Sequence, residues 1–171
     1  KQMPISNEEV ALFKENLPFK LTNAQERTIK EISDDISLSK PMRRLVQGDV
    51  GSGKTVVAAV SMYISAKNNT QSVLLCPTEV LAEQHFKNFS AWFKNSKIKI
   101  ELLTGKMPVS KRRGIYQDLE DGVIDILIGT HAVFQDKVKM KNLGLVVVDE
   151  QQRFGVKQRF DLVKKSSDQI M

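Results

Sequence analysis

The sequence predicts an α/β fold, a mostly parallel central sheet with helices on both faces, and three observations lead to this prediction. Short apolar runs typical of strands alternate with segments of helical periodicity along nearly the whole chain, which is the pattern of β–α–β units. Residues 143–148 read Leu-Gly-Leu-Val-Val-Val and are apolar on both faces, as a central parallel strand requires. A glycine-rich run, Gly48 to Thr55, stands between a predicted strand and a predicted helix. Ligands of such sheets bind at the carboxyl ends of the strands.

The first part of the chain predicts two helices and then a strand–loop–helix unit. Residues 7–16 form a short helix ahead of a Leu-Pro-Phe break. Residues 22–36 carry isoleucines at helical spacing until Pro41 ends the pattern. A strand over 44–47 and a helix over 54–67 flank the glycine-rich run.

The second part continues the alternation of strands and helices. Residues 97–103 alternate lysine and isoleucine, and we expect a strand there with two different faces. The predicted strands cover 72–76, 97–103, 124–128 and 143–148, and the predicted helices cover 79–92, 110–120 and 156–165. The chain shows no internal repeat and no linker.

Composition limits the classes of protein that the chain can belong to. The 171 residues are one domain's length, and 41% apolar residues suffice for a packed core. No apolar stretch approaches the ~18 residues that span a membrane, and no secretory signal stands at the start. The net charge of +6 is compatible with a polyanionic partner, although the basic residues are spread out. A single cysteine, Cys76, excludes an internal disulfide and fits a reducing, cytoplasmic setting.

The run from Gly48 to Thr55 fits the pattern G-x-x-x-x-G-K-[ST] of phosphate-binding loops. Its glycines allow backbone N–H groups to turn inward around phosphates, and the following helix adds its positive end. Lys54 can reach the β- and γ-phosphates, and the Thr55 hydroxyl can bind Mg²⁺. The predicted nucleotide-binding residues of the loop are Gly48, Gly51, Ser52, Gly53, Lys54 and Thr55.

An acidic pair, Asp149-Glu150, directly follows the most apolar predicted strand. Asp149 can hold Mg²⁺ opposite Thr55, since Mg²⁺ prefers hard oxygen ligands. Glu150 can polarise a water molecule in line with the γ-phosphate. An acidic pair after a strand can also simply begin a loop, and this alternative stays open on the residues alone.

Taken in order, these motifs resemble those of superfamily-two helicases. Gly48–Thr55 resembles motif I, residues 77–85 resemble motif Ia, residues 103–105 motif Ib, residues 129–132 the next motif, and residues 149–152 motif II. Further phrases, including Pro41-Met42-Arg43-Arg44-Leu45 and Phe154-Gly155-Val156, are most similar to the RecG type of ATP-dependent DNA helicase, with the transcription-repair coupling factor as the nearest relative. The resemblance runs from about residue 17 to the end. It implies a RecA-like P-loop NTPase lobe over 21–171, preceded by a lead-in helix and loop over 1–20.

The resemblance implies that the cofactors are ATP and Mg²⁺, with Gln25 and Phe19 at the adenine. The Gln25 amide would donate to and accept from the base edge, and Phe19 would lie against the ring. Thr22 and Gln25 also have the S/T-x-x-E/Q spacing of a helix capping box. Both roles can hold with different atoms of Gln25.

The resemblance also implies DNA as a partner. Residues after three predicted strands would bind DNA phosphates, which positions the strand without reading its sequence; they are Thr78, Glu79, Thr104, Gly105, Thr130 and His131. Helix N-capping is the alternative for the three threonines. His85 and His131 have no metal-ligand spacing, so we expect no zinc site.

The sequence departs from the family pattern in two ways. Gln152 stands where RecG-type sequences usually carry histidine, and this position is implied to couple nucleotide state to DNA movement; an amide cannot become cationic. The chain starts at Lys1 and ends at Met171, before motif III would follow. We therefore expect a fragment whose parent adds a second RecA-like lobe with an arginine finger and an N-terminal wedge domain for branched or forked DNA. Alone, it should bind ATP weakly and hydrolyse it very slowly.

Three alternatives remain from the sequence. One is a non-catalytic, nucleotide-gated DNA-binding module, and another is the motor lobe of a coupling-factor-like translocase. The third is a P-loop GTPase or small-molecule kinase, which the absence of an N/T-K-x-D pattern after the acidic pair disfavours.

Overall fold

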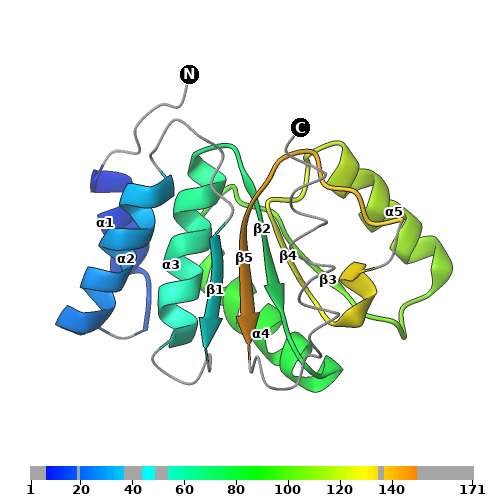
Figure 1. Cartoon of the computed structure of the whole chain (residues 1–171), viewed down its shortest axis with the longest axis horizontal. Helices are drawn as coiled ribbons and strands as arrows, with labels where there is room; N and C mark the ends of the chain where they lie inside the picture. The colour runs from blue at the N-terminus through cyan, green and yellow to red at the C-terminus, as the bar shows by residue number, and fades with distance from the viewer. Residues whose placement is uncertain (1–6, 19, 37–43, 49–53, 135–136, 150–171) are drawn as a thin grey trace.

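The fold, given by a computed structural model, contains a central parallel sheet (Figure 1). The structure describes residues 7–18, 20–36, 44–48, 54–134 and 137–149. In this part of the chain the sheet has five strands in the order β1-β5-β2-β4-β3, and every neighbouring pair is parallel. The strands are β1 (Arg44–Gly48), β2 (Gln71–Leu75), β3 (Ile100–Leu103), β4 (Ile126–Gly129) and β5 (Leu143–Asp149). The predicted fold class is confirmed.

Five α-helices and one 3₁₀-helix accompany the sheet in the described residues. They are α1 (Asn7–Glu15), α2 (Asn23–Ile36), α3 (Lys54–Lys67), α4 (Glu79–Trp92), α5 (Val109–Glu120) and η1 (His131–Phe134). None of these helices combines the length and apolar character that crossing a bilayer requires.

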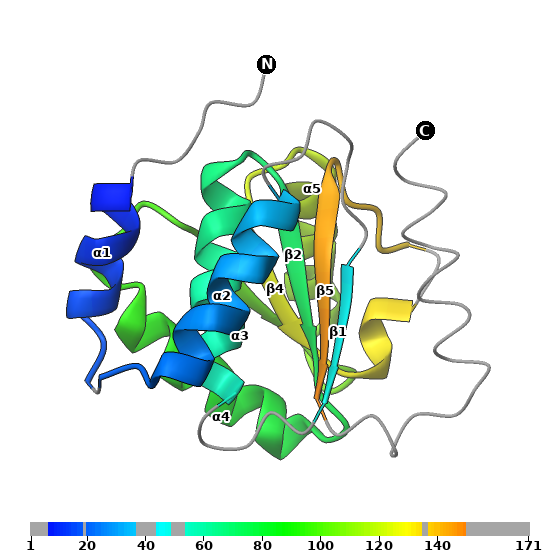
Figure 2. The same cartoon turned by 60° about the vertical axis from the view of Figure 1, so that its left-hand side comes forward.

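The strand order explains why the helices cover both faces. The crossovers β1–α3–β2 and β2–α4–β3 advance across the sheet in one direction, whereas β3–α5–β4 returns in the other. Because parallel crossovers are right-handed, reversal of direction moves the connecting helix to the opposite face. Figure 2 shows α1, α2 and α3 on one side of the sheet and the yellow 3₁₀-helix on the other.

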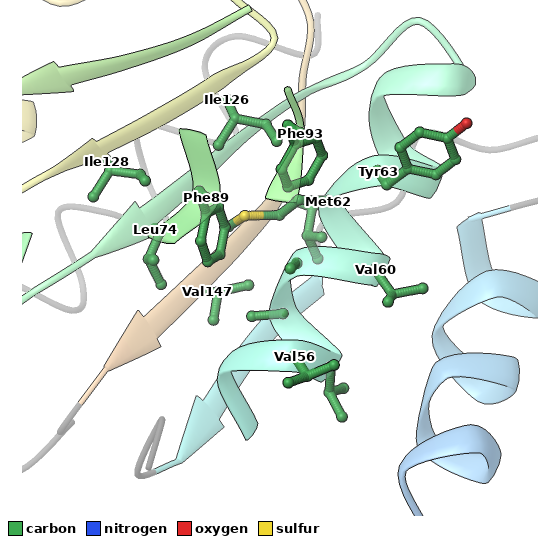
Figure 3. Packing of buried hydrophobic residues seen from close by; sticks show 14 of the residues in the cluster. Val56, Val60, Met62, Tyr63, Leu74, Phe89, Phe93, Ile126, Ile128 and Val147 are labelled. Atoms are coloured by element: carbon green, nitrogen blue, oxygen red, sulfur yellow. The ribbon is translucent and has the colours of Figure 1, made fainter. Parts of the chain in front are cut away.

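Two apolar clusters lie on the two faces of the sheet. Successive side chains of β5 alternate between them, with Leu145 and Val147 in one cluster and Val146 and Val148 in the other. The first cluster joins the sheet to α1, α3 and α4, and Figure 3 shows the side chains of α3 and α4 that pack on the strands. In it the Phe13 ring of α1 stacks on Tyr63 of α3, with centroids 4.4 Å apart and planes 7° apart. Helix α1 therefore contributes to the same core as the sheet.

The largest differences between the predicted and the observed elements are two strand starts and one short helix. β3 begins at Ile100 rather than residue 97, because it lies at the sheet edge and its one neighbour in the described part, β4, pairs with it only over Ile100–Leu103. β4 begins at Ile126 rather than residue 124. The 3₁₀-helix η1 was not predicted. The helix predicted over 156–165 lies outside the described residues.

Candidate functional site

The predicted phosphate loop and acidic pair begin at neighbouring strand ends. β1 and β5 are adjacent, and their last paired residues are Gly48 and Asp149. The first residue of the glycine-rich run therefore lies beside the predicted magnesium ligand, although the two motifs are far apart in the sequence. This adjacency depends on β5 being inserted between β1 and β2.

Helix α3 starts at Lys54, directly after the glycine-rich run. Thr55 lies in its first turn and is 7% exposed. The helix is packed on most of its circumference, with Val56, Val60 and Met62 all buried, so its amino-terminal end is held firmly against the sheet. A helix amino terminus with unpaired N–H groups attracts phosphate. Gly51, Ser52 and Gly53 lie outside the described residues.

The Asp149 carboxylate is buried at the end of β5, with an exposed fraction of 2%. Its Oδ2 lies 3.1 Å from Nε2 of His85 on α4. The Sγ of Cys76, which follows β2, lies in the same cluster, since one ligand atom from each of the three residues falls within 4.8 Å of the others. His85 was a residue that the sequence reasoning missed, because its only signal was its place in the motif Ia stretch.

The donor set of Asp149, at the end of β5, and Thr55, in the first turn of α3, fits Mg²⁺. Asp149 offers a carboxylate and Thr55 a hydroxyl, both hard oxygen ligands of the kind Mg²⁺ prefers. Thr55 stands one residue into the helix that follows the loop, and Asp149 pairs with the first residue of the loop. Glu150 and Gln152 lie outside the described residues, so their predicted roles stay predictions.

The capping box predicted for Thr22 and Gln25 is present. Thr22 N–H donates to Gln25 Oε1 at 2.8 Å, and Gln25 N–H donates to Thr22 Oγ1 at 3.2 Å. The box engages the carbonyl oxygen of the Gln25 amide, and the adenine role predicted for Gln25 stays a prediction. Phe19 lies outside the described residues.

The residues predicted to bind DNA gather after β2, β3 and β4. Gly129 of β4 pairs with both Leu75 of β2 and Leu103 of β3, so the segments that begin after these residues leave the sheet side by side. Thr104 and Thr130 are the first residues after two of the strands, and each is 4% exposed.

Capping accounts for one of the three threonines. Thr78 is the N-cap of α4, and its Oγ1 accepts a hydrogen bond of 3.3 Å from Leu81 N–H. Thr104 does not cap α5, whose N-cap is Pro108, and the capping alternative is therefore wrong for Thr104. For Thr130, the backbone carbonyl accepts from Val133 N–H as η1 begins.

A link between two of the predicted DNA-binding segments was also missed. Glu79, in the first turn of α4, pairs with Lys106 at 3.3 Å, and the Lys106 side chain is 86% exposed. Lys106 follows Gly105 directly. An exposed cation next to Thr104 and Gly105 in the chain suits a polyanion, and the signal for it was a lysine immediately after a predicted DNA-binding glycine.

Known proteins with similar sequences are RecG helicases. The chain is 52% identical over 151 residues to the ATP-dependent DNA helicase RecG of Aquifex aeolicus, a match that covers 88% of this chain and 19% of the relative. It is 48% identical over 155 residues to RecG of Synechocystis, covering 91% of this chain and 19% of the relative. It is also 48% identical over 163 residues to RecG of Bacillus subtilis, covering 95% and 24%.

A solved structure described as RecG bound to a three-way DNA junction matches with a TM-score of 0.78 and 44% identity. The match covers 90% of this chain and 21% of that one. The chain thus spans about a fifth of the length of the relatives it matches. The sequence matches the DEAD/DEAH box helicase family over residues 22–170, and the chain belongs to that family.

Proposed function

We propose that this chain is the ATP-binding motor lobe of a RecG-type DNA helicase, which couples ATP hydrolysis to unwinding or remodelling of branched DNA. The observation that supports it best is the pairing of Gly48 with Asp149, which brings a phosphate-binding loop and an acidic strand end together. The similarity to RecG over most of the chain supports the choice of DNA as the substrate.

The reaction is transfer of the γ-phosphoryl group of ATP to water. Lys54 and the loop N–H groups bind the phosphates, and Thr55 and Asp149 hold Mg²⁺. When bound, Mg²⁺ neutralises charge that develops on the phosphate oxygens. Glu150 accepts a proton as water forms a bond to the γ-phosphorus, the bridging P–O bond breaks, and ADP leaves. Gln25 and Phe19 hold the adenine.

DNA binding is assigned to the carboxyl ends of β2, β3 and β4, which lie next to one another in the sheet. Thr104 and Thr130 follow neighbouring strand ends there. The other contacts with the phosphates are assigned to Thr78, Gly105 and His131 and to the backbone N–H of Glu79, whose carboxylate pairs with Lys106. The net charge of +6 suits this partner. Because one lobe supplies half of such a motor, the function needs a second RecA-like lobe and a wedge domain for the branch. We place the protein in the cytoplasm with its DNA substrate.

The experiment that tests this function is Glu150→Gln in a full-length protein, meaning a chain as long as the RecG relatives. A catalytic base contributes about 10²–10⁴-fold to rate, so ATP turnover should fall by about that factor while nucleotide affinity stays unchanged. A non-catalytic, nucleotide-gated DNA-binding module would instead keep its DNA function. Turnover equal to that of the wild type would contradict the proposed role of Glu150.

The choice of substrate needs a second measurement. Turnover should be measured with single-stranded, duplex and forked DNA. Stronger stimulation by forked DNA supports the RecG type, whereas equal stimulation by duplex DNA favours a coupling-factor-like translocase.

A further inference from the structure

Helix α4 connects the proposed DNA-binding segments, which follow the ends of β2, β3 and β4, to the proposed magnesium site. Thr78 caps the helix at the end of β2, and His85 lies seven residues later, about two turns along the helix. One face of α4 is fixed in the core, since Ala82 and Phe89 are both 0% exposed; Figure 3 shows Phe89 among the buried side chains. The ring of His85 therefore has a fixed place relative to the sheet.

The contact between His85 and Asp149 has the geometry of a hydrogen bond. Nε2 and Oδ2 are 3.1 Å apart, and the two side chains are 9% and 3% exposed. An ionised carboxylate can only accept, so with Asp149 ionised the Nε2 atom is the donor of this contact.

A second observation indicates that His85 does more than fill space in the core. Its Nδ1 is buried and has no hydrogen-bond partner among the described residues. A buried imidazole nitrogen without a partner is unfavourable, so packing alone does not explain why a histidine stands here. The bond to Asp149 does explain it.

The same cluster offers ligands of a different kind. Cys76, His85 and Asp149 are a thiol, an imidazole and a carboxylate, which together suit Zn²⁺. However, the direct bond of His85 to Asp149 already engages the ring nitrogen and the carboxylate oxygen with each other. A soft-metal site at this cluster is therefore the alternative outcome of the experiment below.

We propose that His85 is a positioning residue, whose hydrogen bond to Oδ2 holds the Asp149 carboxylate in the orientation in which it would bind Mg²⁺. The inference rests on the proposed function, because it assigns the orientation of the proposed magnesium ligand. Outer-shell hydrogen bonds of this kind orient metal ligands, and their loss costs about 10–100-fold in metal affinity or activity. Thr78 and Glu79 stand at the start of the same helix, α4, so this helix contributes to both proposed sites.

The test uses two substitutions of equal length in a full-length protein. His85→Gln keeps an N–H donor, whereas His85→Met has a similar shape and no donor. Binding of Mn²⁺ in the presence of ADP is measured from the signal of free Mn²⁺ in electron paramagnetic resonance. The Mg²⁺ concentration for half-maximal ATP turnover is measured in parallel.

We expect His85→Met to weaken Mn²⁺ binding about 10–100-fold and His85→Gln to restore it to within about threefold of the wild type. Ser90→Ala, an exposed change on the same helix, is the control and should match the wild type. His85→Leu repeats the loss of the donor with a second side chain if the Met variant does not fold. A merely structural role would change the melting temperature equally in both variants and leave Mn²⁺ affinity unchanged.

Three results would overturn the inference. One is a Met variant with wild-type Mn²⁺ affinity, and another is a Gln variant no better than Met. The third is a Co²⁺–thiolate absorption band that appears in the wild type and vanishes in Cys76→Ala, which would make the cluster a soft-metal site. If the wild type itself binds no Mn²⁺ with nucleotide, the proposed function fails as well, whereas normal wild-type binding with an unaffected Met variant sinks only the role of His85.

Discussion

Replacing Gln71 by methionine tests whether one buried side-chain amide holds the amino-terminal ends of neighbouring strands together. Gln71, the first residue of β2, is 3% exposed. Its Nε2 donates to the carbonyl oxygens of Leu119 and Ile124 at 3.0 and 2.9 Å. Its Oε1 accepts from Asn142 N–H at 2.9 Å. One amide thus joins the end of α5, the approach to β4 and the approach to β5.

The magnitude follows from the three hydrogen bonds. Methionine has about the same length as glutamine, so the change removes the polar atoms and leaves little cavity. Three net contributions of about 0.5–1.5 kcal/mol each give roughly 1.5–4.5 kcal/mol. The buried carbonyls that lose their donor add to this cost. We therefore expect the free energy of unfolding to fall by about 3 kcal/mol, a large share of the stability of a domain.

Urea unfolding of the purified chain measures this change, with the slope of the transition as a check that the unfolded state is unaltered. Gln117→Met is the matched control. Gln117 is exposed and bonds only locally, to Asp121 at 3.0 and 3.1 Å, so its substitution should change stability by at most about 0.5 kcal/mol. Equal effects of the two substitutions would show that the buried amide does not hold these segments together.

Two further predictions concern the packing of β4 and the pH dependence of stability. Gly129→Ala should lower the free energy of unfolding by about 1–3 kcal/mol, because a Cβ there would lie 2.6 Å from Leu103 O and 2.9 Å from Val133 Cγ1. Gly114→Ala in α5, with nothing within 4 Å, should instead be neutral or stabilising in urea unfolding, and the reasoning fails if both variants lose stability alike. Burial raises the pKa of Asp125 above 3.8 despite the Lys99 N–H bond and the charge of Lys67. The folded chain therefore holds this proton more tightly, and Asp125 costs stability as pH rises through its folded pKa. Asp125→Asn, which keeps an acceptor for Lys99 N–H, should be more stable than the wild type at neutral pH and equal to it at low pH; a difference that does not vary with pH would contradict this.

Much of the sheet could be predicted because its signals are local. The apolar runs and the helical spacing depend on neighbouring residues, and so does the capping box of Thr22 and Gln25. The errors came where a boundary depends on a partner. The lysine and isoleucine alternation over 97–103 is typical of a strand, but a strand continues only as far as its neighbour extends, and β4 pairs with only four of these residues. In the same way, nothing near Phe13 indicates that its ring stacks on Tyr63.

In the candidate site, too, the local motifs could be predicted and the contacts between distant residues could not. The phosphate loop and the acidic pair carry chemistry that their own residues display, and strand alternation alone brought them to one edge of the sheet. The neighbour relation of Gly48 and Asp149 was beyond the sequence, because it requires β5 to be inserted between β1 and β2.

The contact of His85 with Asp149 was even harder to predict from the sequence. It joins residues 64 positions apart, and it requires that α4 turn one particular face toward the sheet. That rotation is decided by the burial of Ala82 and Phe89, which share the face with His85 at spacings of three and four residues. In the sequence the histidine stands among several polar residues of an amphipathic helix, and its lack of metal-ligand spacing drew attention away from it. The packing of the helix, rather than any motif, makes it the neighbour of the proposed magnesium ligand.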